Sequence, residues 1–372
     1  MLAELERHPH ARALLAPALA GGTPSHAYLF HGPGGAGKRA LARAMAAELL
    51  AEGSPDPDGA RARVYNDAHP DLTWVVPSGA HEILVSDIAG PVIAAASKTP
   101  FESSRRVFVI ERVDELGDEA ANRMLKTLEE PAPFVHLILL TSRLEEVLPT
   151  IRSRCQLVRL EPPSAEQVAA GIEELGVSAA TALACVRLAL QDADAARELA
   201  GEEGRALRAA AERFARAALS GEMVAARPWT DLLAAARARG DLAGAQLESL
   251  AEAELELTSR KEQKRVSAEW SERVKRSRRR EQTGALDLAL QLVTLWFADL
   301  ACLAWDAEEL VRNCDRLAEL REDAQSDGGM HPARLRAAIE LVEETRVRFA
   351  LNVSEELACE ALAYRLERTV TP

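Results

Sequence analysis

One segment, His31-Gly-Pro-Gly-Gly-Ala-Gly-Lys-Arg39, constrains the fold more than any other part of this 372-residue chain. It follows a short apolar run at residues 27–30, typical of a β-strand, and precedes a helical pattern over residues 39–51. Lys38 and the glycines fill the G-x-x-x-x-G-K part of a phosphate-binding loop, whose backbone N–H groups and lysine surround an anion. The glycines are Gly32, Gly34, Gly35 and Gly37. A strand, this loop and a helix in succession predict an α/β domain that binds its ligand at the carboxyl end of the strand.

The last position of this loop is chemically wrong for hydrolysis. Arg39 stands where a Ser or Thr hydroxyl would hold Mg²⁺. The predicted strand at residues 107–110 is followed by Glu111, which can serve weakly as the acid that organises the metal, and by Arg112. A guanidinium cannot accept a proton, so Arg112 cannot activate a water molecule. We therefore expect no ATP hydrolysis by this chain, no required cofactor, no metal, and at most weak ATP binding at a vestigial loop.

The remaining pattern predicts an α/β domain followed by an all-α region. Apolar runs that do not alternate, separated by helical stretches, are typical of a doubly wound parallel sheet covered on both faces. The expected strands are residues 27–30, 72–76, 107–110, 135–140 and 156–160, and the expected helices 39–51, 85–97 and 118–129. Pro162 and Pro163 end this domain, and Ser164 with Gln167 forms a capping-box pattern that opens a helix. The later segments 206–219, 285–305 and 333–351 all have helical spacing.

Charge and composition exclude several classes of function. A net charge of −13 argues against general binding of DNA through the whole surface. Residues 260–280 are strongly basic, and we favour a solvated helix face over a nucleic-acid patch for them. Five scattered cysteines without a C-x-x-C pair indicate free thiols. The absence of an 18-residue apolar run predicts no membrane span, and the charged start of the chain predicts a cytoplasmic protein.

Several motifs together resemble the clamp-loader branch of the AAA+ proteins. Residues 122–131 read NRMLKTLEEP, and residues 149–155 read PTIRSRC. The family's hallmark sequences L-L-K-T-L-E-E-P and S-R-C match these two segments. Residues 25–30, SHAYLF, and the His69-Pro-Asp71 segment fit the same family. The motif matches cover residues 25–160, and a weaker helical likeness covers the rest, especially residues 352–366.

The resemblance implies a chain of three parts. These are an AAA+ core with a degenerate P-loop at residues 1–162, a small helical lid at 163–203, and a helical collar for oligomerisation at 204–372. It implies that Arg154 is an arginine finger inserted into a neighbour's ATP site, with Arg152 as the nearby structural alternative, and that Thr141 is a sensor-like position. Two family features are missing: residues 51–68 lack the cysteines of a zinc module, and the lid segment QDAD at residues 191–194 lacks a sensor arginine.

These features predict a non-catalytic clamp-loader subunit in DNA replication. The chain would not be an enzyme alone, although the complex belongs to a replicative DNA polymerase holoenzyme. Its expected partners are the other loader subunits in a hetero-pentamer, with the sliding clamp and primed DNA reached through the complex, and no membrane. The intact loop lysine leaves one alternative, an active AAA+ motor subunit of the same loader. A nucleic-acid-binding module built on residues 260–280 is the third hypothesis, disfavoured because no aromatic residues for base stacking are interleaved there.

Overall fold

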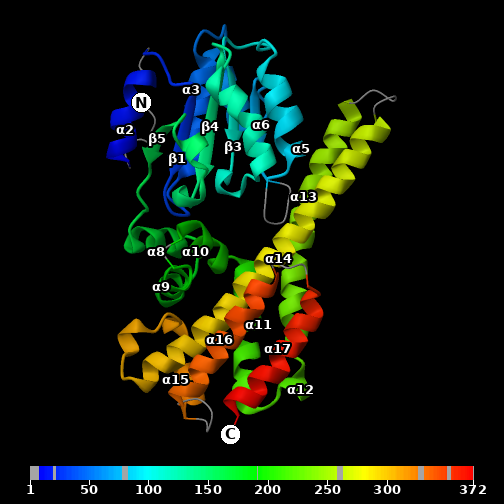
Figure 1. Ribbon diagram of the computed structural model, residues 1–372. Coiled ribbons are helices and arrows are strands. Elements are labelled where there is room, and N and C mark those ends of the chain that lie inside the picture. Colours follow the sequence, from blue (N-terminus) through cyan, green and yellow to red (C-terminus); the bar gives the residue numbers. More distant parts are fainter. Residues whose placement is uncertain are drawn as a thin grey trace. The chain divides into compact units, whose positions relative to one another are not determined.

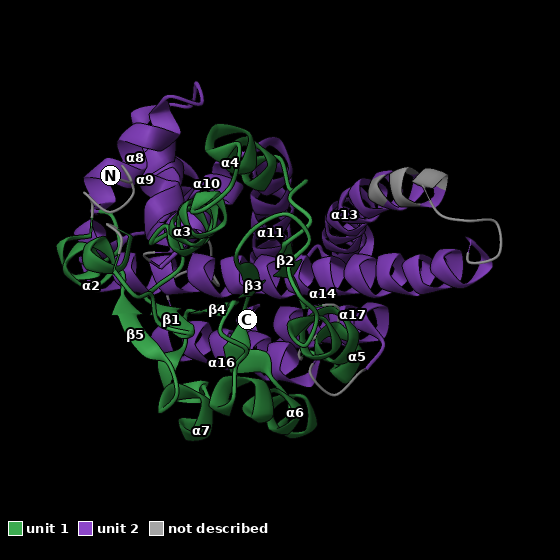
Figure 2. Cartoon of the chain, turned by 90° about the horizontal axis from the view of Figure 1, so that it is seen from above, with its two compact units in different colours: residues 1–163 green, residues 164–372 purple. Residues whose placement is uncertain are grey.

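The computed structural model describes residues 8–19, 22–77, 83–190, 192–257, 263–325, 331–349 and 353–371. The chain divides into two compact units, Met1–Pro163 and Ser164–Pro372, which Figure 2 colours green and purple. The boundary lies one residue from the domain end expected at 162. The further division between lid and collar near residue 203 stays a prediction.

Unit 1 is built on a five-stranded, fully parallel sheet in the order β2-β3-β4-β1-β5. The strands are β1 Ala27–His31, β2 Leu72–Val75, β3 Arg106–Ile110, β4 Val135–Thr141 and β5 Gln156–Arg159. Each lies where the sequence predicted a strand, within one residue at either end. Because β1 lies between β4 and β5, the loop that follows it lies at the carboxyl edge of the sheet, where doubly wound folds bind ligands.

Both faces of this sheet are buried, as the non-alternating strands predicted. Successive side chains of a strand point to opposite faces, so Phe30 packs with α2 and α3 while its neighbour Leu29 packs with α6 and α7. Figure 1 shows α2 and α6 on opposite sides of the sheet, and Figure 2 shows α3 on the side of α2 and α7 on the side of α6. The helices of unit 1 are α2 Pro9–Leu19, α3 Lys38–Ala51, α4 Pro57–Tyr65, α5 Val85–Ile88, α6 Asp118–Glu129 and α7 Pro149–Arg152, with short 3-10 turns η2 Val113–Glu115 and η3 Leu144–Glu146.

The helix expected over residues 85–97 is irregular, which corrects the prediction. The single α-helical turn α5 is followed by a π-helical turn, η1 Ala89–Ala94, and by two more α-helical residues. Pro91 lies in η1 and has no N–H group to donate, so a regular α-helix cannot run through it. Periodicity placed the apolar residues correctly, since Ile88 and Val92 are buried against the sheet.

The His69-Pro-Asp71 motif organises the segment that leads into β3. The fully buried Asp71 carboxylate accepts the backbone N–H groups of Phe101, Glu102 and Ser103 at 2.6, 2.9 and 2.9 Å. His69 Nδ1 in turn accepts the N–H of Asp71 at 3.1 Å. Charge-assisted hydrogen bonds of this kind are among the stronger ones in proteins. One side chain therefore fixes a turn that joins two distant parts of the sheet.

Replacing Asp71 should be severely destabilising. Asp71→Ala leaves three N–H groups without their acceptor in a buried site, and we expect the free energy of unfolding to fall by roughly 3 kcal/mol. Asp67→Ala is the matched control, because Asp67 makes an exposed ion pair with Arg43 and such pairs contribute at most about 1 kcal/mol. Urea unfolding followed by circular dichroism measures both, and equal losses would contradict the role assigned to Asp71.

Unit 2 contains no strand among its described residues, as expected. Its helices are α8 Ala165–Glu173, α9 Ala179–Leu188, α10 Ala193–Ala200, α11 Glu202–Ser220, α12 Met223–Ala226, α13 Trp229–Leu257, α14 Gln263–Ala304, α15 Leu317–Ala324, α16 Pro332–Phe349 and α17 Glu355–Val370, with 3-10 turns η4 Glu308–Leu310 and η5 Cys314–Arg316. The capping box that opens α8 is confirmed, because Ser164 and Gln167 exchange hydrogen bonds at 2.9 and 3.2 Å. One continuous apolar core extends from Val168 to Val370.

The long helix α14 forms the centre of this core. Its buried side chains include Leu286, Leu290, Val293, Phe297 and Leu300. Among described helices it alone is long and apolar enough to cross a membrane, with a mean hydropathy of 1.6 over 18 residues, of which 56% are buried inside the structure. A core helix has this same length and composition, so the expectation of no membrane contact stays a prediction.

The basic segment forms the first half of α14, apart from residues 260–262, which lie outside the described residues. Several of its arginines are already neutralised within the unit. Arg265 pairs with Glu269, Arg278 lies 3.3 Å from both Asp241 and Glu248, and Arg279 lies 3.2 Å from Glu355. This pairing fits the favoured interpretation of a solvated face that balances an acidic protein.

Candidate functional site

The phosphate loop connects β1 to α3 in the context that the motif requires. Gly37 precedes α3 in the left-handed conformation, with φ of 79°, and provides no side-chain cap, so the first N–H groups of the helix are left for a ligand. Gly32, with φ of 150°, passes so close to β5 that a Cβ atom there would lie 2.3 Å from the Leu160 carbonyl oxygen. Lys38 Nζ donates to the carbonyl oxygens of Gly32 and Pro33 at 2.7 and 2.6 Å. The lysine thus closes the loop on itself.

Arg39 places a cation beside the carboxylate that would organise a metal. Its Nε donates to Glu111 Oε2 at 2.8 Å, and its Nη2 contacts the same oxygen. The other carboxylate oxygen accepts the Trp74 indole N–H at 2.6 Å. Glu111 is buried, at 5% exposure, and a buried carboxylate requires such partners. Both of its oxygens are therefore engaged within unit 1, one by a guanidinium and the other by an indole N–H.

Arg112, which follows Glu111, has an unusual backbone conformation and a nearby ion-pair partner. It adopts φ of 53°, an uncommon conformation for a residue other than glycine, and forms an ion pair with the buried Glu115. Arg112, the residue after Glu111, is thus paired with the last residue of η2.

Thr141 ends β4 beside β1, in register with His31. Its hydroxyl donates to Asp114 Oδ1 at 2.6 Å and accepts the N–H of Arg143 at 2.9 Å. Arg143 also binds Asp114 through its side chain at 2.9 Å. Thr141 therefore connects the end of β4 to η2, the turn that follows β3, and its sensor-like role stays a prediction.

Arg154 lies between α7 and the edge strand β5. Its Nη1 donates to the Thr150 carbonyl oxygen at 2.8 Å, and its Nη2 lies 2.5 Å from Glu129 Oε1, at the end of α6. Arg152 contacts the Leu144 carbonyl oxygen and Glu145 instead. Both arginine side chains are 34% exposed, so exposure does not distinguish them. What differs is the partner, because Arg154 connects the S-R-C segment to the L-E-E-P segment.

Cys155, the last residue of the S-R-C motif, packs against the core of unit 1. Burial raises the pKa of its thiol to about 12. The thiol therefore stays protonated at neutral pH and has little nucleophilic character. This cysteine supports the fold next to Arg154 rather than providing chemistry.

Three of these partners were missed by sequence reasoning. Trp74 has the same apolar context as any core aromatic residue, so nothing in the sequence connects its indole to Glu111. Asp114 is one of many acidic residues in the chain. Only the pairing of β3 with β4 brings it beside Thr141. Glu129 did carry a signal, since it belongs to the L-E-E-P segment that was singled out.

Together, the strand order, the loop after β1 and the acid after β3 define unit 1 as a P-loop domain of the AAA+ class. Residues 7–164 match the sequence model of the family described as "DNA polymerase III, delta subunit". The match to this family therefore covers nearly the whole of unit 1. The predicted resemblance, whose best match was the delta-prime subunit of bacterial DNA polymerase III, is confirmed.

Three curated relatives illustrate the similarity. The DNA polymerase III subunit delta' of Pseudomonas aeruginosa is 35% identical over 137 residues, which are 35% of this chain and 42% of the relative. The subunit delta' of Bacillus subtilis is 35% identical over 161 residues, 42% of this chain and 48% of the relative. The subunit gamma/tau of Mycobacterium tuberculosis is 35% identical over 167 residues, 43% of this chain and 29% of the relative. The chain thus spans less than half the length of each.

Proposed function

We propose that this protein is a non-catalytic subunit of the bacterial DNA polymerase III clamp loader in DNA replication. The observation that carries the proposal is the Arg39–Glu111 ion pair, with Trp74 on the second oxygen of the carboxylate. A metal at this position would have to displace the guanidinium from a buried acid. Arg112 adds a second, independent defect. On its own the chain is not an ATPase, although it belongs to the DNA polymerase holoenzyme by association.

The positive contribution of the chain is Arg154, donated in trans to the ATP site of a neighbouring subunit. A guanidinium has a fixed planar fork that suits the oxygens of a transferring phosphoryl group. The position of Arg154 beside an edge strand and its partial exposure support this role. In the free chain Glu129 holds the guanidinium, so docking against a neighbour exchanges one anionic partner for another.

The proposed partners are the gamma/tau and delta subunits of a hetero-pentamer in the cytoplasm. The sliding clamp and primed DNA are reached through this complex, and the collar formed by residues 204–372 mediates its assembly. ATP binding at the vestigial loop is weak and no cofactor is required. The alternative, an active gamma/tau-like motor, retains one supporting observation, the intact glycine loop with Lys38.

The Mg²⁺ dependence of nucleotide binding separates these two functions. Because Arg39 neutralises Glu111, the affinity of the wild-type chain for ADP should change less than about twofold between Mg²⁺ and EDTA, a difference under 0.5 kcal/mol. Arg39→Thr restores a metal-binding hydroxyl and releases Glu111, so its affinity should rise on the order of tenfold with Mg²⁺. Isothermal titration calorimetry measures both. A wild-type chain that binds ADP at least tenfold more tightly with Mg²⁺ would favour the motor.

A further inference from the structure

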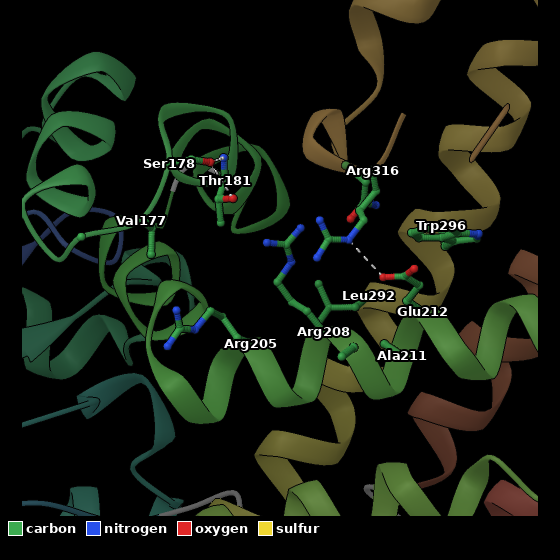
Figure 3. A pocket seen from close by; sticks show the side chains of 13 residues that line it. Val177, Ser178, Thr181, Arg205, Arg208, Ala211, Glu212, Leu292, Trp296 and Arg316 are labelled. Atoms are coloured by element: carbon green, nitrogen blue, oxygen red, sulfur yellow. Dashed lines mark hydrogen bonds and ion pairs between the residues drawn. The ribbon is translucent and has the colours of Figure 1, made fainter. Parts of the chain in front are cut away.

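Unit 2 contains a pocket of about 340 Å³ that none of the features above uses. It lies between the start of α9, one side of α11, the middle of α14 and the η5 turn (Figure 3). Arg205 and Arg208 line it from α11, and Arg316 lines it from η5. Figure 3 shows the guanidinium groups of Arg208 and Arg316 near each other and that of Arg205 farther along α11, on the side of Val177. A concave site of this size with a few convergent polar groups is typical of small-molecule binding.

The charges in and around this pocket do not cancel. Arg208 is held rigidly, because its side chain is only 10% exposed and its Nη2 donates to the buried Asp315 at 2.8 Å. Arg316 binds Glu212 through Nε at 3.3 Å. The Arg205 side chain, in contrast, has no ion pair or hydrogen bond with any of the residues described, and its backbone N–H is bonded to the Gly201 carbonyl oxygen. Three guanidinium groups therefore face two carboxylates, which leaves one positive charge without a counter-ion.

The opposite wall adds hydroxyl groups and an apolar surface. Ser178 caps α9, accepting the N–H of Thr181 at 3.2 Å, and both hydroxyls line the pocket beside the positive end of the helix. Leu292 and Trp296 of α14 form the apolar part. Trp296 is fixed in place by the hydrogen bond from its indole N–H to Asp323 at 3.0 Å. The pocket thus offers cationic donors on one side and an apolar wall on another.

We propose that this pocket binds a small molecule that carries a phosphate or polyphosphate group. The phosphate oxygens would lie between Arg205 and Arg316, with Arg208 as a donor whose direction is set by Asp315. A tetrahedral polyanion can accept from guanidinium groups that approach from two different elements, whereas a carboxylate has only one plane of acceptors. Inorganic pyrophosphate and nucleotides both carry such a phosphate group, so either type of molecule is a candidate ligand.

The test uses the full chain with Lys38→Ala as background, which disables the phosphate loop of unit 1. Isothermal titration calorimetry with inorganic pyrophosphate, and separately with ADP, should show saturable binding. Adding Arg205→Ala or Arg316→Ala should weaken it about tenfold, the effect of one lost charge-assisted contact. Arg213→Ala is the matched control on α11, because Arg213 pairs with Asp231 and does not line the pocket. Thermal unfolding of each variant verifies the fold.

The affinities measured for the two probes distinguish the possible ligands. Equal affinities for pyrophosphate and ADP would assign the site to the phosphate alone, and tighter ADP binding would add a contact of the nucleoside with the Leu292 and Trp296 wall. Absence of saturable binding of both probes to the Lys38→Ala chain at millimolar concentration would overturn the proposal. So would an Arg205→Ala affinity equal to that of Arg213→Ala. Arg205→Glu serves as a second variant, and it should abolish binding of either probe.

Discussion

An Arg154→Ala chain should fold and assemble normally, yet remove ATP hydrolysis at one site of the reconstituted clamp loader. An arginine finger neutralises charge that develops on the transferring phosphoryl group, and such residues contribute about 10³ to 10⁵ in rate in other nucleotide hydrolases. The other ATP sites would keep fingers from other subunits, so the loss for the whole complex is partial. Folding should be little affected, because Arg154 makes a partly exposed ion pair with Glu129.

Two further variants test position and geometry. Arg154→Lys should recover only part of the activity, because an ammonium group lacks the planar fork and the reach of a guanidinium. Arg152→Ala removes the same charge two residues away, from a side chain of equal exposure that contacts Glu145 instead. The steady-state ATPase rate of the complex, stimulated by clamp and primed DNA, is the measurement. Equal impairment by Arg152→Ala would show that the finger has been assigned to the wrong residue.

The isolated chain should show no ATP turnover above the uncatalysed rate. Two independent defects produce this result: the Arg39 guanidinium binds the acid that would organise Mg²⁺, and Arg112 cannot activate water. Correcting one defect is insufficient, so Arg39→Thr alone should remain inactive even if it gains Mg²⁺-dependent binding. A coupled assay of ATP hydrolysis by the purified chain measures this. Robust hydrolysis that Lys38→Ala abolishes would instead establish an active motor.

The sheet could be predicted from the sequence because each strand is a short apolar run buried on both faces. Phe30 and Leu29 exemplify this, since their opposite orientations both end in packed cores. The irregular helix at residues 85–94 could not, because apolar spacing is nearly the same for an α-helix and for the π-turn that Pro91 accompanies. The sequence predicted helix over 260–280 and over 285–305 but did not show that both lie in one helix, because the first segment is charged and the second apolar.

The candidate site was predicted as a set of positions but not as a set of contacts. The loop motif identified Lys38, Arg39 and Glu111 as related in function, yet their chain separation gives no geometry. That Arg39 reaches the Glu111 carboxylate, 72 residues away, follows only from the adjacent positions of α3 and β3 in the fold. The Trp74 and Glu129 contacts depend in the same way on tertiary structure, which periodicity and motif spacing do not encode.

Two variants of this chain, compared in otherwise wild-type reconstituted complexes, test the central claim most directly. If the chain only donates a finger, Lys38→Ala should leave the clamp- and DNA-stimulated ATPase rate unchanged, while Arg154→Ala should lower it by the contribution of one site. A complex impaired by Lys38→Ala and unaffected by Arg154→Ala would contradict the claim, because the chain would then hydrolyse ATP itself and supply no finger to its neighbour.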